Sequence, residues 1–120
     1  METRRSRNRT GKKMKIITLC GSTKFKLEFE MSAKALSEVG WFVHSVEIYG
    51  HADNIPMTPE YKKWLEDTHY WKIDRSDAIY VVDVNGYIGD STKREIEYAT
   101  KKGIEIFYQS RLYIKGESVE

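Results

Sequence analysis

A chain of 120 residues has room for one domain with one hydrophobic core. Hydrophobic residues make up 40% and charged residues 32%, and no apolar run approaches the roughly 18 residues that cross a membrane. The formal net charge of +2 argues against a nucleic-acid-binding body, and the one cysteine excludes an internal disulfide. We therefore expect a cytoplasmic protein with no membrane association and no nucleic-acid partner.

Residues 1–13 differ in composition from the rest of the chain. They carry six Lys or Arg residues against one Glu, with no periodicity and almost no apolar content. This composition predicts a disordered basic arm before a single domain over residues 14–120. An upstream extension or a solvated tail explains the arm better than phosphate contacts do. No apolar segment follows it, so we expect no secretory signal.

The first half of the domain predicts a strand, a helix and a second strand. Residues 15–20 are almost continuously apolar, as in a strand that is covered on both faces. Residues 24–39 have the apolar spacing of an amphipathic helix, which Gly40 would end. Residues 41–49 predict the second strand.

The second half repeats this alternation. Thr58 and Pro59 are typical of a helix start, and the helix should run to near Arg75 with Trp64 and Trp71 in the core. A third strand over residues 78–84 and a helix that runs to about Lys102 and ends at Gly103 follow, and residues 104–108 predict a fourth strand. The composition of residues 111–114 indicates a short edge strand.

The alternation of strands and helices predicts the fold class. We expect an α/β, three-layer, flavodoxin- or Rossmann-like doubly wound fold with a mostly parallel sheet of four to five strands. In such folds ligands bind beyond the carboxyl ends of the strands at the topological switch point. The turns after the first and third strands should therefore face one site.

The turn after the first strand reads Gly21-Ser22-Thr23-Lys24. Glycine allows close approach of a ligand, and the N–H groups at a helix start favour an anion. An ordinary strand-to-helix turn capped by serine accounts for the same residues equally well. Neither the P-loop nor the dinucleotide-binding glycine spacing is present.

The stretch after the third strand holds Glu95 near the start of a helix. Two interpretations are open. Thr92 and Glu95 have the spacing of a capping box, in which Glu95 would bond to a backbone N–H. Alternatively, Glu95 lies in the first turn as a carboxylate kept ionised by the helix N-terminus, able to attack the anomeric carbon of a sugar. Glu97 lies on the other side of the helix and should be solvated.

Other polar residues give weaker signals. Asp83 lies near the carboxyl end of the third strand and can point into the site, whereas Asp74 and Asp77 should lie at the opposite end of the sheet. The three histidines and one cysteine lack metal-ligand spacing, so we predict no metal and no cofactor.

Two stretches together resemble a known family. Leu19-Cys20-Gly21-Ser22 and residues 89–99, Gly-Asp-Ser-Thr-Lys-Arg-Glu-Ile-Glu-Tyr-Ala, resemble the nucleoside 2-deoxyribosyltransferase-like superfamily, which includes deoxynucleoside 5′-monophosphate N-glycosidases. The resemblance covers roughly residues 14–109. It implies an enzyme that cleaves or transfers the N-glycosidic bond of a 2′-deoxynucleoside or its 5′-monophosphate.

The resemblance also implies roles for individual residues. Glu95 matches the nucleophile that attacks C1′ and forms a glycosyl-enzyme intermediate. His69 occupies the position, eight residues before Asp77, where the family usually has an aspartate, and could protonate the leaving base or bind substrate. The expected substrate-binding residues are Cys20, Gly21, Ser22, Thr23, Lys24, Asp83, Gly89, Ser91 and Thr92.

The change from aspartate to His69 keeps a second interpretation open, namely a non-catalytic domain that binds a nucleotide or nucleotide sugar. A third is an interaction domain in which both turns are structural. Because one subunit of this size would hold a shallow site, and because the family forms oligomers, we expect a homodimer or higher homo-oligomer.

Overall fold

The computed structural model describes residue 11 and residues 13–46, 49–50 and 52–111. Most of the predicted basic arm over residues 1–13 lies outside the described residues. So do residues 112–114 of the predicted edge strand, whose first residue, Arg111, lies in a helical turn.

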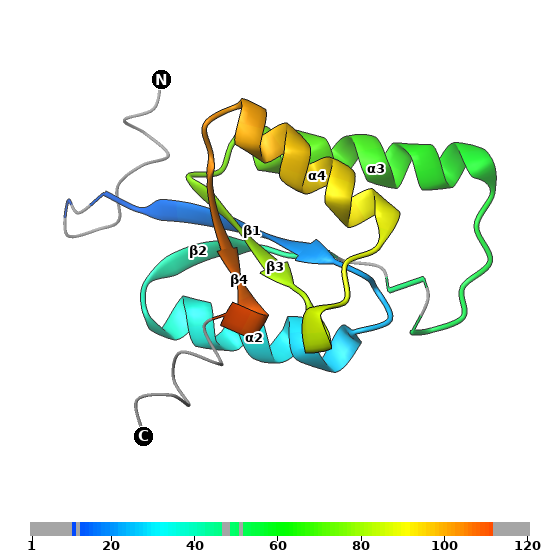
Figure 1. Ribbon diagram of the computed structural model, residues 1–120, viewed down its shortest axis with the longest axis horizontal. Coiled ribbons are helices and arrows are strands. Elements are labelled where there is room, and N and C mark those ends of the chain that lie inside the picture. The colour runs from blue at the N-terminus through cyan, green and yellow to red at the C-terminus, as the bar shows by residue number, and fades with distance from the viewer. Residues whose placement is uncertain (1–10, 12, 47–48, 51, 112–120) are drawn as a thin grey trace.

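The described residues form a four-stranded parallel sheet with helices on both faces (Figure 1). The strand order is β2-β1-β3-β4, so the chain reverses direction across the sheet between β1 and β3. Helix α2 covers one face, and α3 and α4 lie together on the other (Figure 1). This arrangement confirms the predicted α/β fold class. The elements are β1 (Lys15–Gly21), α2 (Lys26–Glu38), β2 (Trp41–His44), α3 (Pro59–Asp74), β3 (Ala78–Val82), η1 (Val84–Gly86), α4 (Asp90–Lys101) and β4 (Glu105–Tyr108).

Two hydrophobic clusters hold the three layers together. Successive side chains of a strand point to opposite faces of a sheet, so β1 and β3 contribute to both clusters. On the α2 side, Phe29 packs against Ile17 and Leu19. On the α3 and α4 side, Ile73 and Ala99 pack with Cys20, and the alternation therefore turns the cysteine toward the layer of α3 and α4.

The signals at several helix ends act as predicted. The Thr58 side chain accepts a hydrogen bond of 3.1 Å from the Tyr61 backbone N–H, and Pro59 is the first residue of α3. Gly40 and Gly103 follow α2 and α4 with φ angles of 105° and 74°, which glycine adopts readily. The turns at Gly40 and Gly103 lead directly into β2 and β4, so the connections from helix to strand are short.

Two predicted strands extend at least two residues beyond the observed ones. β2 ends at His44 rather than Tyr49, and residues 47–48 lie outside the described part. β3 ends at Val82, because the chain turns at Asn85, whose φ is 54°, into the short 3₁₀ helix η1. The apolar run therefore continues past the strand into the turn that leads to α4.

The prediction that Trp64 and Trp71 lie in the core is wrong. Trp64 is 59% exposed and Trp71 is 53% exposed, because α3 packs on the sheet through Ile73 and turns its aromatic side outward. The Trp64 ring stacks on Tyr61, and the Arg75 guanidinium lies 3.6 Å from the centre of the Trp71 ring.

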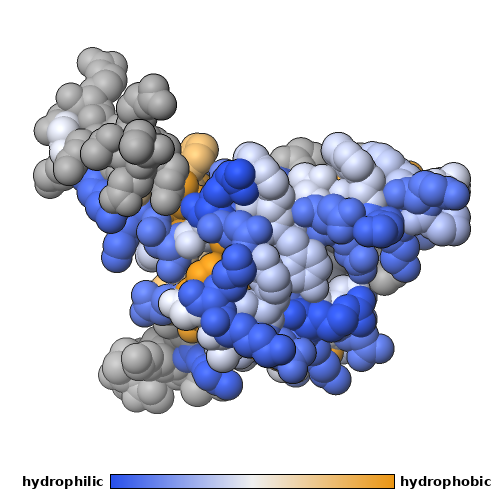
Figure 2. Space-filling view, turned by 90° about the horizontal axis from the view of Figure 1, so that it is seen from above, coloured by the Kyte–Doolittle hydropathy of each residue, from blue (hydrophilic) through white to orange (hydrophobic). Residues whose placement is uncertain are grey.

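The face formed by α3 and α4 is mostly hydrophilic, with a few scattered hydrophobic residues (Figure 2). Among the described residues, no helix combines the length and the apolar character needed to span a membrane.

Candidate functional site

A cavity of about 510 Å³ opens at the carboxyl ends of β1 and β3, where the chain reverses direction across the sheet. This is the position that the fold class predicts for a ligand. The turn after β1, one side of α3, the beginning of α4 and parts of the loop after β2 form its wall. The lining residues are Gly21, Ser22, Thr23, Val46, Gly50, Ile55, Met57, Lys62, Leu65, Glu66, Thr68, His69, Lys72, Tyr87, Gly89, Asp90, Ser91, Thr92 and Glu95.

Glu95 lies in the second turn of α4, whereas the sequence predicted that it lies in the first turn. The helix begins at Asp90 after Gly89, and no side chain caps its start. The capping-box interpretation of Thr92 and Glu95 is therefore wrong. The Glu95 side chain is instead buried at the cavity wall, with 8% of the residue exposed, whereas Glu97 is exposed as expected.

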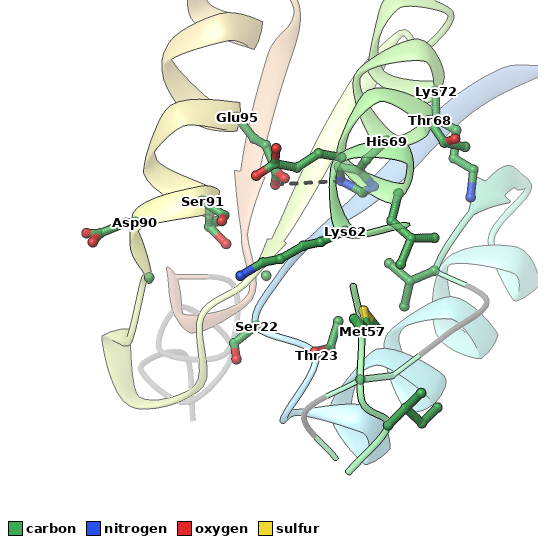
Figure 3. A pocket seen from close by; sticks show the side chains of 18 of the residues that line it. Ser22, Thr23, Met57, Lys62, Thr68, His69, Lys72, Asp90, Ser91 and Glu95 are labelled. Atoms are coloured by element: carbon green, nitrogen blue, oxygen red, sulfur yellow. Dashed lines mark ion pairs between the residues drawn. The ribbon is translucent and has the colours of Figure 1, made fainter. Parts of the chain in front are cut away.

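Three reactive side chains meet at the inner end of the cavity. His69 Nε2 lies 3.6 Å from Glu95 Oε1, and the two side chains approach each other from α3 and α4 (Figure 3). The same nitrogen lies 3.3 Å from the Sγ of Cys20, which is fully buried at the end of β1. The parallel sheet thus brings together a thiol, an imidazole and a carboxyl group from three elements.

Burial dominates the ionisation of this cluster. It raises the pKa of Glu95 from its usual 4.5 to about 7, and the negative charge of Glu66 adds to this effect, while a hydrogen bond with Cys20 opposes it. Burial, with the nearby Glu95 carboxylate, raises the pKa of the Cys20 thiol well above its usual range. Burial therefore opposes the ionisation of Glu95 that was expected from its place near the helix N-terminus.

The pKa of Glu95 predicts a pH-dependent stability. Because its folded pKa of about 7 exceeds the ordinary 4.5, the folded protein binds more protons than the unfolded chain between these values. The stabilisation is fully present below pH 4.5 and is lost as the pH rises through about 7. The loss should approach about 3 kcal/mol of unfolding free energy.

Denaturant unfolding of the wild type and of Glu95→Gln, measured from pH 4 to pH 8.5, tests this expectation. Glutamine resembles the neutral acid and does not ionise, so the stability of the wild type should fall relative to the variant as the pH rises. Parallel stability curves for the two proteins would contradict it.

The structure brings most of the predicted binding residues to the cavity. Gly21, Ser22 and Thr23 line it from the β1 turn, and Gly89, Ser91 and Thr92 line it from the start of α4. Cys20 lies behind this wall, in contact with His69.

Two predicted binding residues lie elsewhere. Lys24 is exposed, and its Nζ lies 3.8 Å from the centre of the Tyr87 ring. The Asp83 carboxylate is buried and accepts hydrogen bonds of 2.8 Å and 2.6 Å from the backbone N–H and the hydroxyl of Ser110. Asp83 thus holds the chain after β4 rather than lining the cavity. Asp77 lies at the opposite end of the sheet, as expected, where its carboxylate accepts from the Ile16 N–H.

Helix α3 contributes more residues to the cavity than His69, which alone was expected from the sequence. Lys62, Glu66, His69 and Lys72 all line the cavity and recur at intervals of three or four residues, which places them on one side of the helix. Lys62 extends toward the side of the cavity that carries Ser22 and Ser91 (Figure 3). The spacing of these polar residues is present in the sequence, but the aromatic residues Trp64 and Trp71 favour a different side of α3 as the buried one.

Comparison of the chain with protein-family models, with curated proteins and with solved structures finds no match.

Proposed function

We propose that the protein cleaves or transfers the N-glycosidic bond of a 2′-deoxynucleoside or a deoxynucleoside 5′-monophosphate, with Glu95 as the nucleophile. The observation that carries this proposal is the burial of the Glu95 carboxyl group in a cavity wall, beside His69 and in the same cavity as the Gly21-Ser22 turn. The resemblance of residues 19–22 and 89–99 to the nucleoside 2-deoxyribosyltransferase-like superfamily supports the same chemistry.

The cavity has a suitable size and polarity for such a substrate. Its volume of about 510 Å³ lies in the range of small-molecule sites. Ser22 and Thr23 offer hydroxyl and backbone donors at the β1 turn, and the Lys62 amine extends toward this side (Figure 3). These groups suit the 5′ end of a deoxyribose or its phosphate. The apolar side chains of Ile55 and Met57 provide a surface for the base.

The reaction would proceed through two displacements. The ionised Glu95 oxygen forms a bond with C1′ while the bond between C1′ and the base nitrogen breaks. The electron pair of that bond passes to the base, which takes a proton from the His69 imidazolium. Water or a second base then attacks C1′ and gives a proton to the neutral His69 imidazole, while the bond between C1′ and the Glu95 oxygen breaks. A carboxyl group with a pKa near 7 is ionised in part of the molecules at neutral pH.

A screen for base release tests the proposal. Purified protein is incubated with each of the four common deoxynucleoside 5′-monophosphates and the matching nucleosides, and free base is measured by chromatography. A second base is added in parallel samples to detect transfer. We expect release or exchange of at least one base, and its absence from all samples would contradict the catalytic proposal.

A non-catalytic nucleotide-binding domain is the second candidate. The position of His69 in place of an aspartate favours it, because a histidine changes the charge beside Glu95. This function predicts that one of the tested nucleotides or a nucleotide sugar binds and remains intact over hours, as followed by calorimetry and by chromatography of the recovered ligand.

A further inference from the structure

The cluster at the inner end of the cavity has the chemistry of a metal site. We propose that Cys20, His69 and Glu95 bind a divalent cation of the zinc class. No spacing motif indicates such a site, and the sequence analysis predicted none, because the three ligands come from β1, α3 and α4. The proposal does not depend on the glycosidic activity.

Two of the three distances between the ligand atoms are close to those of tetrahedral coordination. The third, from the Cys20 sulfur to a Glu95 oxygen, is within 4.8 Å, so the Glu95 side chain would move closer to the sulfur when it binds an ion. Zinc bonds of about 2.3 Å to sulfur and about 2.0–2.1 Å to nitrogen or oxygen place tetrahedral ligands about 3.4–3.6 Å apart. The observed separations of 3.3 Å from sulfur to nitrogen and 3.6 Å from nitrogen to oxygen are close to these values.

The kinds of ligand select the class of ion. A thiolate and an imidazole favour zinc and related transition ions over Mg²⁺ and Ca²⁺, which prefer oxygen ligands. The thiolate and the carboxylate together balance the charge of a divalent ion, so a bound ion would leave no net charge in this buried place. On binding, the sulfur–metal bond forms as the S–H bond of Cys20 breaks, and the proton passes to solvent.

The position of the ligands leaves one coordination position facing the cavity. Cys20 is fully buried behind the wall, whereas His69 and Glu95 line the cavity itself. An ion held by these three ligands has protein on the Cys20 side and the cavity on the other. Three protein ligands and an open fourth position are typical of zinc sites that bind water or a substrate group.

The same ion would make Glu95 a weaker nucleophile. Coordination of one carboxylate oxygen withdraws electron density from the other, so a bound cation should slow the attack of Glu95 on C1′. Metal occupancy therefore provides a means of inhibition for any reaction that needs a free Glu95.

Titration with Co²⁺ tests the site directly, with tag-free protein treated first with a chelator. Tetrahedral Co²⁺ gives visible absorption bands, and coordination by a thiolate adds a charge-transfer band in the near ultraviolet. Because the chain has one cysteine, a charge-transfer band that saturates at one ion per chain identifies Cys20 as a ligand. Added Zn²⁺ should then displace Co²⁺ and remove both bands.

Substitutions identify the remaining ligands. Cys20→Ser should abolish the charge-transfer band, and His69→Ala and Glu95→Gln should each weaken binding of Co²⁺ at least tenfold. Glu97→Gln removes an exposed carboxylate from the same helix and should bind as the wild type does. Circular dichroism establishes that each variant is folded. The proposal would be overturned if the wild type gave no charge-transfer band, or if the band saturated at one ion for two chains. Tight binding of Co²⁺ by His69→Ala would also overturn it.

Discussion

Replacing Glu95 by glutamine should lower base release from the best deoxynucleotide substrate by at least about a thousandfold. An amide has nearly the shape of the carboxyl group but cannot form the ester-like bond to C1′, so the covalent step is lost. The variant should fold normally, because burial already favours an uncharged group at this position. Initial rates at saturating substrate, measured by chromatography of free base, provide the comparison.

Glu97→Gln is the matched control for this loss of activity. Glu97 lies on the same helix, is exposed, and is not among the residues that line the cavity. Its substitution should leave the rate within about twofold of the wild type. If Glu95→Gln releases base as fast as Glu97→Gln does, Glu95 is not the nucleophile, and the reaction must use another group.

Replacing Gly21 by alanine should destabilise the protein by about 2–4 kcal/mol and weaken substrate binding. Gly21 has a φ of 151°, and an added Cβ would lie 2.9 Å from the Val82 carbonyl oxygen and 3.3 Å from the Phe29 ring. These atoms belong to the backbone of β3 and to a fully buried ring, so they cannot move away easily. The turn that carries Ser22 would have to shift instead.

Gly40→Ala separates the two causes of this effect. Gly40 also has a positive φ, of 105°, but an added Cβ would meet no atom within 4 Å. Its substitution should cost only about 1 kcal/mol, from backbone conformation alone. Guanidinium unfolding of both variants measures the difference. Equal losses would mean that the close approach of β3 to the turn does not determine the cost at Gly21.

The fold could be predicted from the sequence because local signals and the hydrophobic pattern agree. The apolar run of β1 indicates a strand covered on both faces, and Thr58 with Pro59 marks the start of α3. Gly40 and Gly103 mark helix ends. The strict alternation of elements then leaves few arrangements of a parallel sheet, and the site at its carboxyl end follows from the arrangement.

The details of the site could not be predicted in the same way. Several residues from Gly89 to Thr92 are able to begin a helix, so the sequence did not determine which turn holds Glu95. The spacing of Trp64 and Trp71 predicts a buried face but does not distinguish it from an exposed aromatic face on a helix that covers a cavity. Cys20, His69 and Glu95 lie far apart in the chain, and only the register of the sheet with the packing of α3 and α4 brings them together.

Cys20 belongs both to the reactive cluster and to the hydrophobic cluster beneath α3 and α4, which includes Ile73 and Ala99. The cluster on the α2 side, around Phe29, lies across the sheet. The cluster on the α2 side should therefore tolerate a wider range of substitutions during evolution than the cluster beneath α3 and α4. Substitutions near Phe29 mainly change how much of the protein is folded, whereas those near Ile73 also move a reactive group. Substitutions in the cluster beneath α3 and α4 would be restricted by the need to position Cys20 as well as by the need to fold.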